Sequence, residues 1–161
     1  MSNREFCVAR RKAEQPAFVK VLKAVPQAKL GYQPDPKART AGDLAWMLAV
    51  EEQALLGILE TGTVAWPDAK TPANVAEIVA SYEKNAAAVT AKIEKLDDAG
   101  WKKNGKLMMG EAGWEDTIEN MVWGFLFDAI HHRGQLTAYI RPMGGKVPGV
   151  YGRSGDEKPG A

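Results

Sequence analysis

Apolar residues recur at spacings of three and four in four segments of the chain, which is the pattern of amphipathic helices. No segment gives a convincing strand pattern. The helical segments cover about residues 4–23, 40–61, 71–100 and 115–142. Between the last two, residues 101–113 hold three glycines and several lysines, and we expect an irregular connection there.

Capping residues and glycines mark the ends of these segments. Thr40 and Thr71 begin the second and third helices, Thr40 with an acid at Asp43 as in a capping box and Thr71 with a proline directly after it. Pro16 lies inside the first helix and should kink or restart it, because proline has no backbone N–H. Glycines are predicted to stop the second, third and fourth helices at Gly62, Gly100 and Gly144.

Four long amphipathic helices in 161 residues predict an all-α protein, a four-helix bundle. A chain of this length buries roughly 70% of the surface that it exposes when unfolded, so it needs no disulfide or metal to hold a core. We therefore expect residues 1–161 to form a single domain. Six of the sixteen glycines follow residue 143, which predicts an irregular tail over about residues 143–161.

Composition and charge limit the classes of binding partner that we expect. Lys and Arg total 21 against 20 Asp and Glu, a net charge of +1, which gives no electrostatic reason to expect nucleic acid or an anionic membrane. The longest apolar runs reach seven residues, whereas a membrane-spanning helix needs about 20. The charged N-terminus does not resemble a signal peptide, so we expect a cytoplasmic protein.

Cysteine and histidine are scarce. Cys7 is the one cysteine, which excludes an intrachain disulfide and a multi-cysteine metal site. Arginines nearby in sequence could lower its pKa, but we expect a buried, unreactive thiol. His131 and His132 are the two histidines, so one chain cannot supply a three-histidine metal site.

Polar residues interrupt two of the apolar stripes. Asp128 and His132 lie four residues apart on the fourth helix, on the same face as Phe125, which suggests that both point toward the core. This pair can chelate a divalent cation or form a charge-assisted hydrogen bond. Glu51 interrupts the stripe of the second helix, and buried carboxylates are uncommon unless they are paired or metal-bound.

The two neighbours of His132 point elsewhere. His131 lies about 100° round the helix from His132, so one site cannot readily use both rings. We expect His131 at the surface or against another helix. Arg133 is expected to face solvent or a partner helix.

These motifs resemble those of the DinB-like proteins. Residues 128–135, Asp-Ala-Ile-His-His-Arg-Gly-Gln, resemble the His-x-x-x-His-Arg-Gly-Gln signature of the last helix of that family. Residues 39–48 resemble its second-helix motif, with Met47 where the family normally has histidine. The tail segment 141–148 is also similar, and the resemblance extends over about residues 14–156.

The resemblance implies a four-helix bundle with an up-down-down-up order. Many DinB-like proteins bind a divalent metal, often zinc or nickel, through three histidines, and many are dimers. The family includes thiol-dependent S-transferases and a mycothiol-dependent isomerase. The three ligand positions fall on Met47, Asp128 and His132 in this chain. Asp128 is an acceptable substitute for histidine, but the neutral thioether of Met47 is a poor ligand for such ions.

Two hypotheses follow. In the first, Glu51 replaces Met47, and Glu51, Asp128 and His132 hold zinc, nickel, manganese or iron in a metal-dependent hydrolase or thiol-dependent transferase; its unknown small-molecule substrate then includes a low-molecular-weight thiol as one candidate. In the second, the chain is a metal-free homodimeric binding or structural bundle that has lost this activity. Asp128 and His132 then form a buried hydrogen-bonded pair, with Met47 filling the ligand space.

Overall fold

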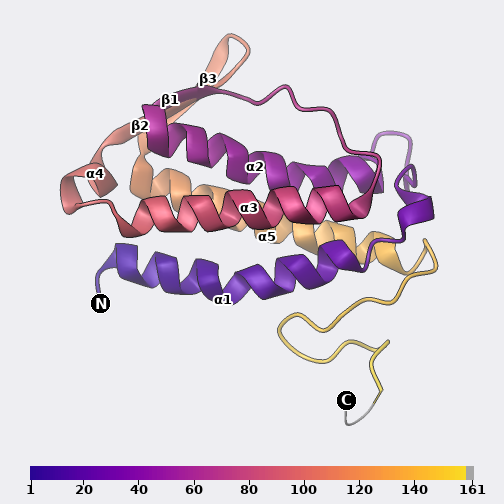
Figure 1. Ribbon diagram of the computed structural model, residues 1–161. Helices are drawn as coiled ribbons and strands as arrows, with labels where there is room; N and C mark the ends of the chain where they lie inside the picture. The colour runs from indigo at the N-terminus through magenta and orange to yellow at the C-terminus, as the bar shows by residue number, and fades with distance from the viewer. Residues whose placement is uncertain (159–161) are drawn as a thin grey trace.

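Four long helices dominate the fold, and a small sheet covers one end of them in the computed structural model, which describes residues 1–158 (Figure 1). The protein is mostly helical, as predicted. The long helices are α1 (Asn3–Lys23), α2 (Ala41–Thr61), α3 (Val75–Glu94) and α5 (Ile118–Ile140). The remaining elements are a 3-10 turn, η1 (Gln27–Lys29), a short helix, α4 (Asp98–Lys102), and the strands β1 (Thr63–Ala65), β2 (Asn104–Met109) and β3 (Ala112–Thr117).

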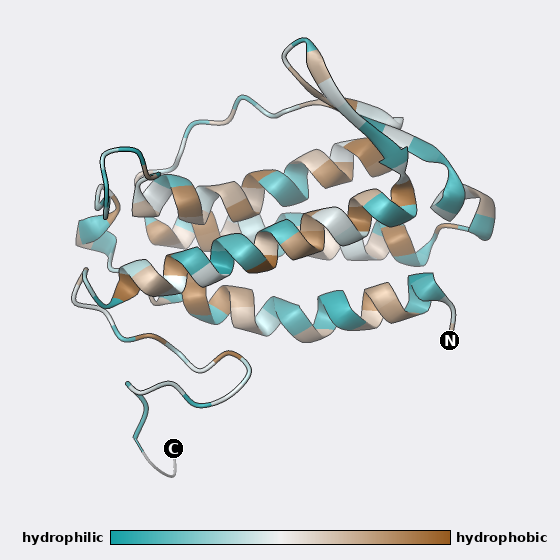
Figure 2. Cartoon of the chain, turned by 180° about the vertical axis from the view of Figure 1, so that it is seen from behind, coloured by the Kyte–Doolittle hydropathy of each residue, from teal (hydrophilic) through white to brown (hydrophobic). Residues whose placement is uncertain are grey.

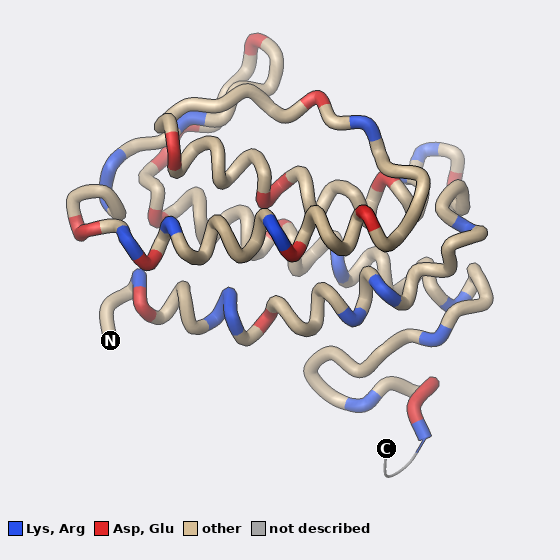
Figure 3. Tube along the Cα trace, viewed as in Figure 1, with Lys and Arg blue, Asp and Glu red and all other residues tan. Residues whose placement is uncertain are grey.

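The long helices pack side by side around a shared interior. Helix α2 contacts α3 and α5, and α1 contacts the same two helices. Hydrophobic residues form bands along the helices (Figure 2), and the buried members of these bands make two adjoining core clusters. Acidic and basic residues are interspersed along the chain (Figure 3). Within residues 1–158, no helix is both long enough and apolar enough to cross a membrane.

The three-stranded sheet corrects the all-α prediction and the irregular connection predicted over residues 101–113. β1 pairs in parallel with β2, and β2 pairs antiparallel with β3, in the order β1-β2-β3. Gly110 turns the β2–β3 hairpin at a φ of 65°. The strand pattern is weak because one of the two fully buried positions of β2 is Gly105, which leaves Leu107 as the only buried large apolar side chain of that strand.

Several helix boundaries follow the predicted signals. Thr40 caps α2 by accepting a hydrogen bond from the Asp43 N–H, and its hydroxyl donates to the Asp43 carboxylate. Gly62 ends α2 in the left-handed conformation, at a φ of 82°. Gly144 follows α5 with a φ of 83°. Helix α1 is continuous through Pro16, so the chain does not restart there.

Other boundaries differ from the predictions. Asn74, rather than Thr71, caps α3, since the helix begins at Val75. The Thr71 hydroxyl donates to the Asp43 carboxylate instead. Gly100 lies inside α4 and does not stop α3, which ends at Glu94. The last long helix begins at Ile118, because the residues directly before it belong to β3.

The chain after α5 contains turns and bends over residues 141–158 and no further helix or strand in that range. Asp156 ties this segment together by accepting hydrogen bonds from the Arg141 side chain and the Val147 N–H. Residues 159–161 of the predicted irregular tail lie outside the described residues.

Candidate functional site

Three side chains from α2 and α5 meet in one cluster. Glu51, Asp128 and His132 each offer a ligand atom, and these atoms all lie within 4.8 Å of one another. Nδ1 of His132 lies 2.6 Å from Oε1 of Glu51 and 4.0 Å from Oδ2 of Asp128. The structure therefore brings together the three residues that the sequence singled out; their role as metal ligands stays a prediction.

The cluster extends from the interior to the surface. The Glu51 side chain is 3% exposed, that of His132 17% and that of Asp128 58%. The expectation that Asp128 points toward the core is thus wrong. So is the buried Asp128–His132 hydrogen bond of the metal-free hypothesis, because the imidazole bonds to Glu51 instead.

Burial and the hydrogen bond between them shift the pKa values of the two inner groups, Glu51 and His132. Desolvation raises the pKa of Glu51 to about 7, although the hydrogen bond and charge of His132 oppose it. The same hydrogen bond with Glu51 raises the pKa of His132 above its ordinary value, against the effect of its own burial. The protonation of the imidazole therefore depends on that of the carboxylate, and the two groups titrate as a coupled pair.

One carboxylate oxygen of Glu51 has no hydrogen-bond partner among the described residues, which bears on whether a cation fits the cluster. This oxygen, Oε2, is buried. Such an oxygen costs free energy unless another group supplies a positive partner. Two carboxylates and one imidazole are ligands that zinc, manganese and iron(II) accept. The residues present therefore fit a divalent cation.

Met47 lies one turn before Glu51 on α2, half-buried. It lines a cleft of about 350 Å³ between α2 and the connection from β1 to α3. Arg39, Asp43, Trp46 and Trp66 also line this cleft. The charge of Arg39 lowers the pKa of His132 slightly, against the larger effect of Glu51, which places a cation near the cluster.

A second cleft of about 350 Å³ reaches Asp128 from the sheet. The sequence had singled out Asp128 and placed Phe125 on the same face, but the other lining residues were missed because no strands were predicted. Trp114, directly after the predicted irregular connection, was the one available signal for an aromatic wall there. The cleft is lined by Trp66, Leu107, Met109, Trp114, Gly124, Phe125 and Asp128.

The remaining sequence candidates play no direct part in the cluster. Cys7 is fully buried, as expected, and desolvation raises its pKa to about 11, so it is not a nucleophile at neutral pH. His131 is exposed and its Nε2 is hydrogen-bonded to the side chain of Gln135 at 2.9 Å, which agrees with a surface position.

Arg133 faces a partner helix rather than solvent. The residue is 2% exposed, and its guanidinium donates to Oε2 of Glu14 on α1 at 2.8 Å. It also stacks over the ring of Phe18, 4.4 Å from the ring centroid. The Arg133 side chain therefore joins α5 to α1 on a different side of the helix from the cluster.

Comparisons with known proteins agree with this architecture. The model of the DinB family matches residues 1–159. A DinB-like protein from Bacillus cereus has a similar solved structure, with a TM-score of 0.77 and 21% identity over 91% of this chain and 97% of that one. A DinB-like protein from Bacillus subtilis gives a TM-score of 0.71 and 15% identity over 91% of this chain and 99% of that one. At these identities the likeness is one of fold. A search of curated proteins gives no match.

Proposed function

This chain belongs to the DinB family, and from that premise we propose that it is a metal-dependent enzyme whose ion is held by Glu51, Asp128 and His132. One observation carries the proposal: Glu51 is a nearly fully buried carboxylate, with one oxygen bonded to His132 and the other without a partner among the described residues. If Glu51 and His132 formed only a structural ion pair, nothing would require the second oxygen of Glu51 to be buried without a partner.

A bound divalent ion would act as a Lewis acid, which polarises a substrate group and lowers the pKa of water or of a thiol. The chain's own groups hold and orient the site. Leu48 and Leu55, both fully buried, fix the α2 turn that presents Glu51. The hydrogen bond between Nδ1 of His132 and Oε1 of Glu51 fixes the orientation of the His132 ring. Asp128, which is exposed, is the member of the cluster that solvent and substrate reach first.

The reaction class that we propose is hydrolysis or thiol-dependent group transfer, with a small-molecule substrate. The family resemblance supports these two classes. The cleft lined by Asp128 and the cleft lined by Met47, one turn from Glu51, support a substrate larger than water alone. A low-molecular-weight thiol is the co-substrate that we propose for the transferase.

We further propose the family arrangement for the whole chain: a single-domain four-helix bundle with an up-down-down-up order, working in the cytoplasm as a homodimer. The long connection from β1 to α3, which runs back along the length of the helices (Figure 1), supports this order because it lets α2 and α3 run in the same direction. The family resemblance supports the dimer.

A second candidate is a metal-free binding or structural bundle. The 2.6 Å bond between Glu51 and His132 favours it, because that bond satisfies one polar atom of each residue without an ion. The thioether of Met47 at a family ligand position favours it too.

Elemental analysis separates the two candidates. Protein purified without an affinity tag is stripped with a chelator, loaded in separate samples with zinc, nickel, manganese or iron(II), and then dialysed. The metal-dependent enzyme predicts about one equivalent of at least one metal per chain. Retention of none of the four, together with a gain of metal binding by Met47→His, would establish the metal-free bundle instead.

A further inference from the structure

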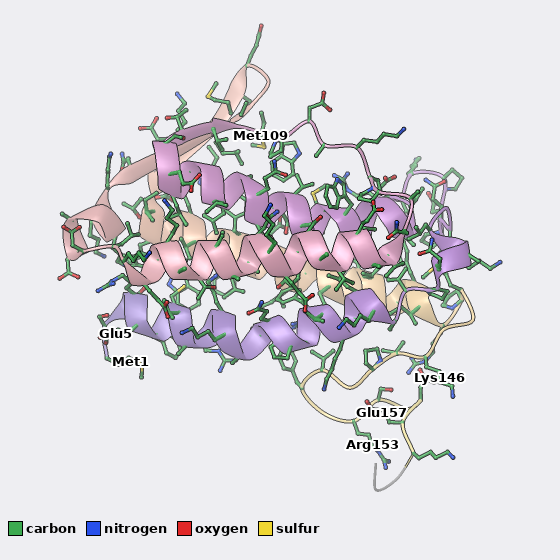
Figure 4. All side chains as sticks on the ribbon, in the orientation of Figure 1. Met1, Glu5, Met109, Lys146, Arg153 and Glu157 are labelled. Atoms are coloured by element: carbon green, nitrogen blue, oxygen red, sulfur yellow. The ribbon has the colours of Figure 1, made fainter. Side chains whose placement is uncertain are left out.

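The second cleft lies between α5 and the sheet, directly beside the cluster. Asp128 is its one charged lining residue among residues 1–158, and it belongs to the cluster as well. The opening faces solvent, since Asp128 is more than half exposed and Met109 is 50% exposed. Figure 4 shows Met109 at the sheet, away from the C-terminal segment that carries Lys146 and Arg153.

The walls of the cleft are aromatic and apolar. The rings of Trp114 and Phe125 lie 5.7 Å apart, and the third aromatic wall is Trp66 from the connection after β1. Aromatic walls of this kind bind flat apolar groups through buried area and ring contacts. The lining has a carboxylate and no basic side chain in the described part of the chain, so an anionic group is disfavoured there.

The position of Trp114 depends on a glycine in the facing helix. A Cβ atom at residue 124 would lie 2.7 Å from Cη2 of Trp114, so the indole packs directly on the α5 backbone. Glycine inside a helix costs about 1 kcal/mol relative to alanine. Gly124 therefore lowers the stability of α5, but it leaves space for the indole of Trp114, which forms one wall of the cleft.

We propose that this cleft is a substrate subsite that takes a neutral, flat apolar group, an aryl ring system in particular, and directs the polar part of the substrate to Asp128. This inference rests on the proposed function, because it assigns Asp128 to the cluster that carries out the reaction. The volume, about 350 Å³, lies within the range of roughly 300–1,000 Å³ that small-molecule sites occupy.

Three probes that share a naphthyl ring and carry polar groups of different charge test the subsite by titration calorimetry on metal-free protein: 2-naphthalenemethanol, 2-naphthylmethylammonium and 2-naphthoate. The neutral alcohol is expected to bind, and the anion to bind at least about tenfold more weakly. Equal or tighter binding of 2-naphthoate would overturn the proposal. Weaker binding of the ammonium probe than of the alcohol would do the same, because the carboxylate of Asp128 should favour a cation.

Gly124→Ala should displace Trp114 into the cleft and weaken binding of the alcohol about tenfold, the effect of losing roughly 50 Å² of apolar contact. Gly134→Ala is the matched control, since a Cβ atom at that position of α5 meets no atom within 4 Å. Equal affinity of the two variants would contradict the subsite. If Gly124→Ala fails to fold, Met109→Ser, at a half-exposed wall residue, is the second variant that tests the subsite. It should also weaken binding of the alcohol.

Failure of this inference and failure of the proposed function are distinguishable. Binding of the naphthyl alcohol is measured without metal, and metal content is measured without the probe. If the protein retains metal and does not bind the alcohol, only the subsite proposal is refuted. A protein that binds the alcohol and retains no metal refutes only the metal-dependent enzyme.

Discussion

Nδ1 of His132 lies 2.6 Å from Oε1 of Glu51, and this bond joins α5 to α2 across 81 residues of sequence. Burial raises the pKa of Glu51 to about 7, and the bond to Glu51 raises the pKa of His132 above its ordinary value. The pair therefore links the protonation of the site to the packing of two long helices.

The stability of the metal-free protein should fall as the pH rises through neutrality. The pKa of Glu51 rises from 4.5 unfolded to about 7 folded, so the folded state holds this proton more tightly and loses that advantage as pH increases across this window. The pKa of His132 is raised above 6.5, so its contribution is complete below that pH and is lost above it. Both groups act in the same direction.

We expect the free energy of unfolding to decrease by about 2 kcal/mol between about pH 5 and pH 8. Urea unfolding of chelator-treated protein at several pH values measures this slope. Glu51→Gln removes the titrating carboxyl and should flatten the curve. A wild-type curve as flat as that of the variant would show that the two groups do not titrate in this way.

The buried arginine of α5 should be important for stability. Arg133 is 2% exposed and donates to Glu14 and to the hydroxyl of Tyr151, so its removal leaves the Glu14 carboxylate buried without its main partner. We expect Arg133→Met to lower the free energy of unfolding by about 3 kcal/mol. Arg10→Gln, which removes the half-exposed partner of Glu14, should cost less than about 1 kcal/mol. Equal effects of both substitutions in urea unfolding would refute this account of the buried pair.

Packing of the sheet on the helices should depend on Gly105. A Cβ atom at this position of β2 would come within 2.6 Å of Ile58 and 2.8 Å of Ile118, both in the core. We expect Gly105→Ala to reduce the free energy of unfolding by about 2 kcal/mol, since the interior is already close-packed. Gly31→Ala adds a methyl group in open space and is the matched control. Thermal unfolding measures both, and a Gly105→Ala variant as stable as the control would be inconsistent with close packing here.

The helices and the cluster were accessible from sequence because they rest on local periodicity. Glu51 and His132 interrupt apolar stripes, and the structure places both on the facing sides of α2 and α5. The exposure of Asp128 could not be predicted from the sequence. Four residues turn a helix by 400°, so Asp128 is offset by about 40° from His132, enough to reach the edge of the buried face.

The sheet was not predictable for a different reason. β1 has three residues, and its residue Thr63 pairs with Lys106, about forty positions later in the chain. No local sequence pattern therefore predicts this strand pairing. The inward positions of β2 include Gly105, whose missing side chain hides the alternation expected of a strand. The walls of the apolar cleft depend on this pairing, and they were therefore missed as well.

Metal affinity in matched variants tests the central claim most directly. Competition against a chelating dye gives the dissociation constant of the tag-free wild-type protein, of Glu51→Gln and of Glu83→Gln, which removes the same charge from an exposed position of α3. We predict that the wild type and Glu83→Gln bind one divalent ion per chain with equal affinity and that Glu51→Gln binds at least about 100-fold more weakly. Equal affinity in all three proteins, or no binding by the wild type, would contradict the assignment of Glu51, Asp128 and His132 as a metal centre.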